Sequence, residues 1–339
     1  MSSPTTSAPV LLGPNQPPQF YAGGAAVAAF RGVGAEDPRS PEDWVASTTT
    51  LFGQDAAGLS ELPDGTRVRE AVSGDPERFL GAAHVAAYGD DPALLVKLLD
   101  AGQRLPVHVH PTREFAGQHL DSRHGKTEAW YVVGATGDDP CVHVGFRDAV
   151  SAATVASWVD RQDGRAMLAA MHRVPVGAGD AVLVPAGTPH AIGEGVFVVE
   201  LQEPTDFSVM LERDAFGITG GDLGLGARAL DCLDRTAWDD DRLDAVRTHP
   251  TTDRGDRVRV LPAAADPFFR AELLRGDVEL EPGYAVLVVL AGAGSLATDG
   301  GAVDVRRGHT VLVPYAAGAG RLTGNVQVLR CRPPDPERP

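Results

Sequence analysis

The stretch LPVHVHPTREFAGQHLDSRHGKTE, residues 105–128, brings His108, His110 and Glu128 close together in the chain. Side chains two positions apart lie on the same face of a strand, so an extended segment would direct both imidazoles to one side. A second segment, VPAGTPHAIG at 184–193, adds His190. Three neutral imidazoles and one carboxylate form a ligand set for a divalent metal such as zinc, manganese, iron or nickel. We therefore predict a metal site made of these four residues.

The alternative for His108 and His110 is a pair of surface histidines on an edge strand. The joint pattern favours the metal site, because HxH, a glutamate that opens a strand and a later PxGxxH block occur in one chain. The other histidines are isolated or lie in polar loops. Among them His124 is close enough to Glu128 in sequence to serve as a substitute ligand.

Three further polar residues are candidates for catalysis. Lys126 precedes Glu128 by two positions and would share its face, where it could hold an anionic group or act as an acid or base. Glu200 ends the strand after His190, and Asp206 follows it, so that either carboxylate could serve as a general base. An exposed loop lysine and ordinary acids at a strand end are the alternatives.

Composition limits the class of protein. The 339 residues are 43% hydrophobic with 39 glycines and 26 prolines, which indicates many short elements joined by turns. A net charge of −16 without a basic cluster argues against nucleic acid and anionic membranes as partners. No apolar run reaches the ~18 residues of a membrane span, and the N-terminal segment does not resemble a signal peptide. We expect a cytoplasmic protein, monomeric or homodimeric, with three cysteines too scattered for a disulfide framework.

The order of patterns predicts a mainly β fold. Residues 1–18 are rich in Ser, Thr and Pro and are expected to form a disordered tail. A segment after residue 150 has helical spacing and would be a helical insertion, whereas 221–250 is dense in Asp and Arg and is expected to link two domains. The expected domains are 19–245, with the metal site and the insertion, and 246–335, without metal.

An internal repeat supports two small β-barrels. GDAVLVPAGTPH at 179–190 aligns with GHTVLVPYAAGA at 308–319, and the shared GxxVLVP core predicts the same strand and turn twice. Ala319 stands at the position of His190. One barrel would thus carry chemistry, and the other only the scaffold.

The blocks HVHP, GKTEAWY, VPAGTPHAIG and VELQ resemble the class I mannose-6-phosphate isomerases, and the resemblance runs from about residue 41 to the C-terminal part. It implies two cupin (jelly-roll) barrels and a metal, usually zinc, bound by His110, Glu128 and His190. It also places Lys126, Glu200 and Asp206 in the pocket. The activity implied is the interconversion of mannose 6-phosphate and fructose 6-phosphate through an enediol, with a sugar phosphate as the partner molecule.

The chain departs from the family pattern at three positions. Where the family reads LSxQxHP, Pro106 replaces the serine and His108 replaces the glutamine ligand. Met210 stands where the family has an arginine, and this removes a charge and a bidentate donor. Two alternatives therefore stay open at this point: a three-His, one-Glu metallocupin that oxidises or epimerises another small molecule, and a sugar-binding cupin without catalysis.

Overall fold

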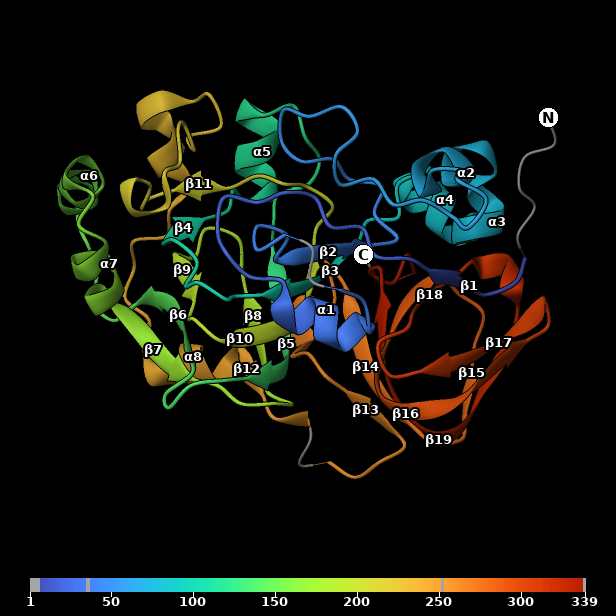
Figure 1. The fold of residues 1–339 in the computed structure, drawn as a ribbon. Helices are drawn as coiled ribbons and strands as arrows, with labels where there is room; N and C mark the ends of the chain where they lie inside the picture. The colour runs from blue at the N-terminus through green and yellow to red at the C-terminus, as the bar shows by residue number, and fades with distance from the viewer. Residues whose placement is uncertain (1–6, 35–36, 251–252, 338–339) are drawn as a thin grey trace.

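The computed structural model describes residues 7–34, 37–250 and 253–337. Within these residues the strands form three antiparallel sheets, with short helices at their edges (Figure 1). The prediction of a mainly β fold is confirmed. Its short strands and frequent turns explain the high glycine and proline content.

Two sheets build the half of the molecule that carries the predicted metal ligands. The six-stranded sheet has the order β12-β8-β5-β10-β3-β2, and the five-stranded sheet has the order β11-β4-β9-β6-β7. The strands of the first are β2 (Glu42–Val45), β3 (Leu95–Asp100), β5 (Glu128–Ala135), β8 (Ala181–Val184), β10 (Val196–Gln202) and β12 (Arg247–Thr248). Those of the second are β4 (His108–Val109), β6 (Cys141–Phe146), β7 (Met171–Pro175), β9 (His190–Ile192) and β11 (Val209–Met210).

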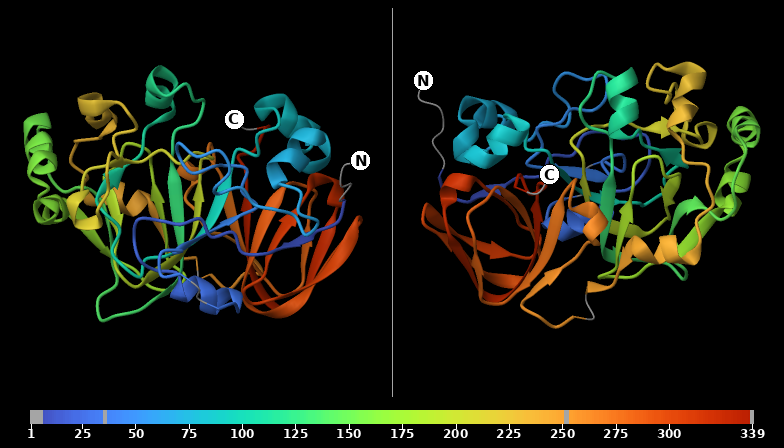
Figure 2. Two further views of the ribbon diagram at one scale, coloured as in Figure 1. Left: turned by 45° about the horizontal axis from the view of Figure 1, so that its top comes forward. Right: turned by 180° about the vertical axis from the view of Figure 1, so that it is seen from behind.

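The eight-stranded sheet contains the C-terminal strands and one strand from the N-terminus. Its main path is β1-β18-β16-β19-β14-β13, with β15 on β19 and β17 on β16. In Figures 1 and 2 it curls beside the other two sheets. The strands are β1 (Val10–Leu12), β13 (Arg257–Arg259), β14 (Arg270–Arg275), β15 (Val278–Leu280), β16 (Ala285–Thr298), β17 (Gly301–Arg306), β18 (Thr310–Val313) and β19 (Gly320–Arg332).

The repeated GxxVLVP segments form equivalent strands. β8 pairs with β5 and β5 with β10, whereas β18 pairs with β16 and β16 with β19. The two paths β8-β5-β10-β3-β2 and β18-β16-β19-β14-β13 thus match strand for strand. The two segments are similar in sequence over one strand and turn only, but the order of the strands around them matches over five strands.

The helices are short. The expected helical insertion is confirmed as α6 (Ala152–Arg161) and α7 (Gly164–Ala170). The segment 76–88 is helical as predicted but breaks at Gly81 into α3 (Pro76–Leu80) and α4 (Ala82–Tyr88). The remaining helices are α1 (Ala25–Arg31), α2 (Val68–Gly74), α5 (Arg113–His119), α8 (Asp240–Ala245) and the 3-10 turns at Asp214–Phe216, Gly226–Cys232, Ala263–Ala265 and Tyr315–Ala317.

Two expectations about chain organisation need correction. Residues 10–12 are not a disordered tail, because β1 pairs with β18 and its apolar side chains pack there; the first six residues lie outside the described part. The segment 221–250 is not a free link either. Cys232, Trp238 and Val246 are buried, because apolar side chains gain free energy when they pack against the sheets beside them. The backbone N–H of Trp238 also donates to Phe146 O.

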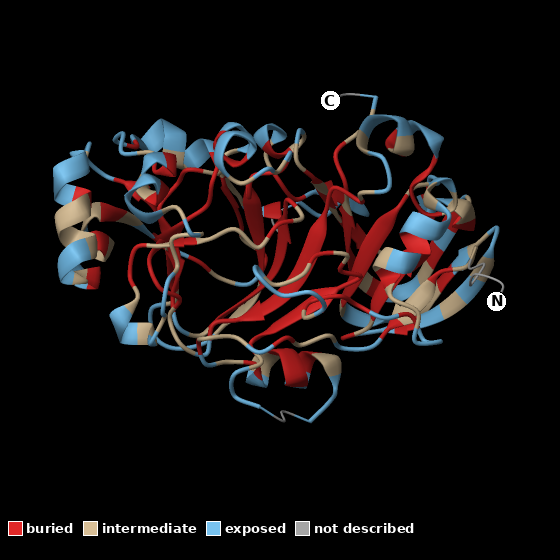
Figure 3. Ribbon diagram, turned by 90° about the horizontal axis from the view of Figure 1, so that it is seen from above, coloured by how far each residue is buried: buried red, intermediate tan, exposed pale blue. Residues whose placement is uncertain are grey.

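The core is continuous across the sheets. One apolar cluster joins residues of both halves, and a second fills the C-terminal sheet; buried residues are red in Figure 3. Arg31 also ties the halves together, because its side chain pairs with Asp43 at 3.0 Å and donates to Gly308 O and Thr310 Oγ1. The site therefore rests on a rigid, buried frame.

Candidate metal centre

The structure brings His108, His110 and His190 together in the interior. Their ligand atoms lie within 4.8 Å of one another, and all three residues are buried. The local reason is strand pairing: His108 opens β4, His190 opens β9, and the two residues are direct partners across these strands. The prediction that His108 and His110 can face one centre is consistent with this cluster.

The backbone fixes the orientation of each ring. Nδ1 of His108, His110 and His190 lies 2.8 Å from the carbonyl oxygens of Pro106, Phe207 and Thr188 respectively. A carbonyl oxygen only accepts, so each Nδ1 must carry the proton. Each Nε2 is then left with a lone pair. Three imidazoles held in this tautomer are prepared to bind a cation.

Glu128 completes the set at the start of β5. Its Oε2 lies 2.9 Å from His110 Nε2, and its Oε1 lies 3.3 Å from His190 Nε2. With both Nδ1 atoms protonated, these contacts join two acceptors and are repulsive without a positive charge between them. His190 Nε2 is also buried without a hydrogen-bond partner in the described residues. The donor set fits a divalent ion of the zinc type.

Lys126 supplies a positive charge at one edge of the cluster. Its Nζ lies 2.9 Å from His110 Nε2 and 3.1 Å from Glu128 Oε2. Burial would raise the pKa of Glu128, but the Lys126 ammonium and the contacts with His110 and His190 outweigh burial and hold that pKa well below its usual range. Burial, followed by Lys126, lowers the pKa of His110 to about 3. Neutral imidazoles beside an ionised carboxylate are the protonation states that metal ligands need.

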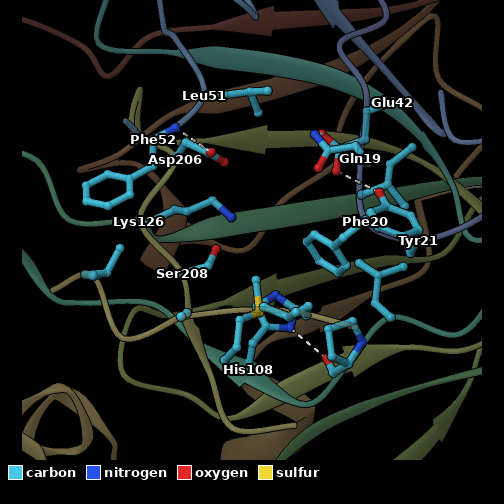
Figure 4. Close-up of a pocket in the computed structure, with 18 of the residues that line it drawn as sticks. Gln19, Phe20, Tyr21, Glu42, Leu51, Phe52, His108, Lys126, Asp206 and Ser208 are labelled. Atoms are coloured by element: carbon cyan, nitrogen blue, oxygen red, sulfur yellow. Dashed lines mark hydrogen bonds between the residues drawn. The ribbon is translucent and has the colours of Figure 1, made fainter. Parts of the chain in front are cut away.

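His108 and Glu128 line a cavity of about 500 Å³, whereas His110 and His190 do not belong to its lining. Figure 4 shows Lys126 and Ser208 pointing into it from one side, opposite Gln19, Phe20, Tyr21 and Glu42. Leu51 and Phe52 form a further part of the wall, and the residues around Gly220 close another part. A cavity of this size holds a small molecule such as a sugar.

Glu200 and Asp206, the two predicted carboxylates, both line this cavity. Glu200 accepts from Trp130 Nε1 at 3.2 Å, and burial followed by the charge of Glu128 raises its pKa to about 7. Asp206 accepts from the backbone N–H of Phe52 at 2.9 Å, and burial raises its pKa. Sequence reasoning placed both near the site, and the structure brings them there.

Lys97 is a cavity residue that sequence reasoning missed. It lies mid-way along β3 with its Nζ 3.4 Å from Glu42 and 3.6 Å from Glu200. Burial would lower the pKa of Lys97, but these carboxylates outweigh it and raise it. A lysine inside the apolar run LLVKLLD, residues 94–100, was the available signal. Glu42 gave no comparable signal, because it comes from a strand more than fifty residues earlier.

Three other residues singled out from the sequence add neither a metal ligand nor a charged hydrogen-bond donor to the cavity. His124 is not part of the cluster but pairs with Asp91 at 2.7 Å, so it is not a substitute ligand. Met210 lines the cavity beside His108, its partner across β4 and β11. Arg213 does not line the cavity and donates to Gly220 O at 3.4 Å. The arginine missing at position 210 is therefore not replaced from position 213.

Fold and cavity together define a mainly β protein with one buried three-histidine, one-glutamate centre. No family model matches the sequence. Among curated proteins it is 37% identical over 133 residues to mannose-6-phosphate isomerase ManA of Bacillus subtilis, and 34% identical over 154 residues to mannose-6-phosphate isomerase of Streptococcus mutans. These matches span 38% and 44% of this chain. They cover 41% and 47% of the relatives, which is less than half of either.

The fold matches over the whole chain. The crystal structure of mannose 6-phosphate isomerase from Bacillus subtilis superposes with a TM-score of 0.76 at 20% identity, covering 96% of this chain and 99% of the other. A mannose 6-phosphate isomerase bound with zinc and yttrium gives 0.74 at 14% identity, covering 97% and 100%. The chain thus has the fold of mannose 6-phosphate isomerases, and its sequence is similar to theirs over 38% and 44% of its length in the two relatives named.

Proposed function

We propose that this chain is a metal-dependent aldose–ketose isomerase that interconverts mannose 6-phosphate and fructose 6-phosphate through an enediol. The observation that carries the proposal is the centre itself: three imidazoles with fixed Nε2 lone pairs and Glu128, beside a cavity. The relatives named above favour isomerisation over oxidation, epimerisation or binding without catalysis.

His108, His110, Glu128 and His190 would hold one divalent ion, for which we propose zinc. Imidazole nitrogens and a carboxylate oxygen suit zinc, and a solved structure with the same fold is bound with zinc. When bound, such an ion polarises a sugar oxygen and stabilises negative charge that develops on it. Elemental analysis of protein purified without added metal distinguishes zinc from iron, manganese or nickel.

Glu200 is our candidate for the base that moves the proton between C2 and C1. Glu200 would remove the C2 proton of the aldose while the C1 oxygen takes a proton from solvent, which gives the enediol. It would then return a proton to C1 while the C2 hydroxyl releases its proton to solvent. A carboxyl group with a pKa of about 7 both accepts and releases a proton near neutral pH. Lys97, 3.6 Å from it, holds the carboxylate in place.

Lys126 and Asp206 have supporting roles in this proposal. The Lys126 ammonium, at the edge of the cluster, is placed to donate hydrogen bonds to a sugar oxygen in the cavity. Asp206 accepts from Phe52 N and so fixes the loop with Leu51 and Phe52 that forms a further part of the wall. Both residues shape and charge the cavity, whereas Glu200 carries out the proton transfer.

We also propose a division into two barrels, one equipped for chemistry and one acting as scaffold. Their matching strand order supports it. The boundary near residue 246 needs a shift to beyond Thr248, because β12 pairs with β8. Within the described residues no helix is long and apolar enough to cross a bilayer.

A coupled assay of fructose 6-phosphate formation from mannose 6-phosphate tests the activity. We expect turnover by the metal-replete protein, with deuterium from the solvent appearing at the exchanged carbon. Glu200→Gln should lower kcat by about a hundred- to ten-thousandfold, the range for loss of a general base, and leave the metal content unchanged. Absence of conversion above background would overturn the proposal.

A further inference from the structure

The charges of the cavity bear on what kind of sugar it accepts. Five carboxylate residues line it, against two lysines; they are Glu42, Glu128, Glu200, Asp206, Asp222, Lys97 and Lys126. Across residues 7–34, 37–250 and 253–337, no arginine belongs to this lining. One divalent ion would still leave acidic side chains in excess. A phosphate group on the sugar would therefore enter an environment that is already negative.

Of the two lysines, Lys97 is paired with carboxylates and Lys126 lies at the metal centre itself. Lys97 is held between Glu42 and Glu200 and lies over the Trp44 ring at 4.4 Å. Lys126 is engaged by Glu128 and by His110. Each ammonium is thus paired with at least one carboxylate, and only 4% and 6% of the two side chains is exposed. Drawing Lys97 to a phosphate would leave Glu42 and Glu200 buried without a cation, and Lys126, beside ligand atoms of His110 and Glu128, lies at the metal end of the cavity.

The wall beside His108 is apolar where a cation would be needed. Met210 forms it, and the backbone of Gly221 packs directly against it, with Met210 N donating to Gly221 O at 2.7 Å. Gly221 has a φ of +85°, and a Cβ there would lie 2.9 Å from Met210 Cβ, so only glycine permits this close approach. The loop 217–226 therefore seals the wall around a neutral side chain.

The polar groups that remain are suited to hydroxyls. Gln19, Gln54, Ser208 and Thr219 contribute amides and hydroxyl groups to the lining. Such groups donate to and accept from sugar hydroxyls, whereas a phosphate binds best to guanidinium or to free ammonium groups. A second hollow, which shares Leu51, Phe52 and Asp206 with this cavity, holds Arg69, whose Nε donates to Thr48 O at 2.6 Å.

We infer that this cavity recognises the end of the sugar away from the metal through uncharged hydrogen bonds, so that an unphosphorylated aldohexose is a substrate as good as its 6-phosphate. The inference rests on the proposed isomerase function and narrows its substrate class. It concerns the cavity wall around Met210, whereas the isomerisation itself depends on the centre and Glu200.

The test compares kcat/KM for D-mannose and D-mannose 6-phosphate with the metal-replete wild-type protein. A charged hydrogen bond to phosphate is worth about ten- to hundredfold in affinity. Because the cavity wall lacks such a bond, kcat/KM for the two sugars should agree within about tenfold. Met210→Arg should raise the preference for the phosphorylated sugar by about tenfold or more. Met210→Gln, of similar length but neutral, is the matched control and should leave the preference unchanged.

The outcomes separate the two proposals. Turnover of mannose 6-phosphate with a preference well above tenfold over mannose would overturn the inference and leave the isomerase proposal standing. Unchanged preference in a Met210→Arg protein that keeps its metal would also contradict it, since the charge would then not reach the sugar. Turnover of neither sugar would overturn the isomerase proposal and, with it, the inference.

Discussion

The two copies of the GxxVLVP strand lie in sheets of the same strand order, but the second copy lacks the counterparts of two metal ligands, Glu128 and His190. Glu128 pairs with Val184 in the first sheet, and Ala285 pairs with the equivalent Val313 in the second. Likewise, His190 is matched by Ala319 in the sequence repeat. The scaffold therefore forms without the ligands, which indicates that the ligands serve function rather than folding.

A second contrast concerns ion pairs at equivalent strand positions. Lys97 pairs with Glu200 across β3 and β10, whereas Glu272 pairs with Arg330 across β14 and β19, so the two charges are exchanged. The first pair is fully enclosed, but the carboxylates around Arg330 stay partly open to water. The enclosed arrangement surrounds a cavity, and the open one lies beside an apolar core.

The largest effect is expected from the ligands themselves. Glu128→Ala and His190→Ala each introduce the residue that stands at the matching position of the second copy, Ala285 and Ala319. We expect the fold to survive and the bound metal to be lost, with activity reduced about a thousandfold, as when a group that stabilises a developing oxyanion is removed. Metal content and circular dichroism of the purified variants test this. Unfolding of both variants would show that the ligands are structural.

Removing the cation of each exchanged ion pair should lower the free energy of unfolding by different amounts. Lys97→Met leaves Glu42 and Glu200 buried without a cation, so we expect a loss of about 3–5 kcal/mol in the free energy of unfolding. Arg330→Met leaves carboxylates that keep 22% and 46% of their side-chain surface exposed, so about 1–2 kcal/mol is expected. Urea denaturation measures both. Equal losses would mean that enclosure does not distinguish the two sheets.

A smaller and pH-dependent effect is expected at His124. Burial alone would lower the pKa of His124, but Asp91 and Glu203 outweigh it and raise the pKa above its ordinary value. The pairing therefore stabilises the fold fully below about pH 6.5, the ordinary value, and this contribution is lost as the pH rises through the higher folded pKa. His124→Gln should remove about 1 kcal/mol at low pH and little at high pH.

The control for this variant is His119→Gln, in the last turn of α5. Both variants should keep their metal, since neither histidine belongs to the cluster. Loss of metal from His124→Gln alone would return His124 to the ligand set. A stability difference that does not vary with pH would mean that His124 is not paired as a cation.

Much of the centre could be anticipated, because its residues lie in local patterns. The HxH spacing, the strand-opening Glu128 and His190 after its turn each follow from short stretches, and the structure gathers them. Lys97 and Glu42 could not be placed in the same way, since only the register of β2, β3 and β10 brings them beside Glu200. The exchange of charges with Glu272 and Arg330 was hidden for the same reason.

The chain organisation was harder to predict than the chemistry. Val10, Leu11 and Leu12 follow a Ser/Thr/Pro-rich start, and nothing local shows that β18 offers them a free edge. Dense Asp and Arg around Trp238 suggested a link, but one buried indole and its neighbours are enough to attach the segment to the sheet. Tertiary contacts decided both cases against local composition.

The number of metal ions bound per chain tests most directly the central claim that one of two similar sheets is equipped for chemistry. Elemental analysis of the purified protein, with the protein concentration measured independently, gives this number. One divalent ion per chain is the result expected, and it should be absent from Glu128→Ala. No stoichiometric ion, or one that remains in that variant, would contradict the claim.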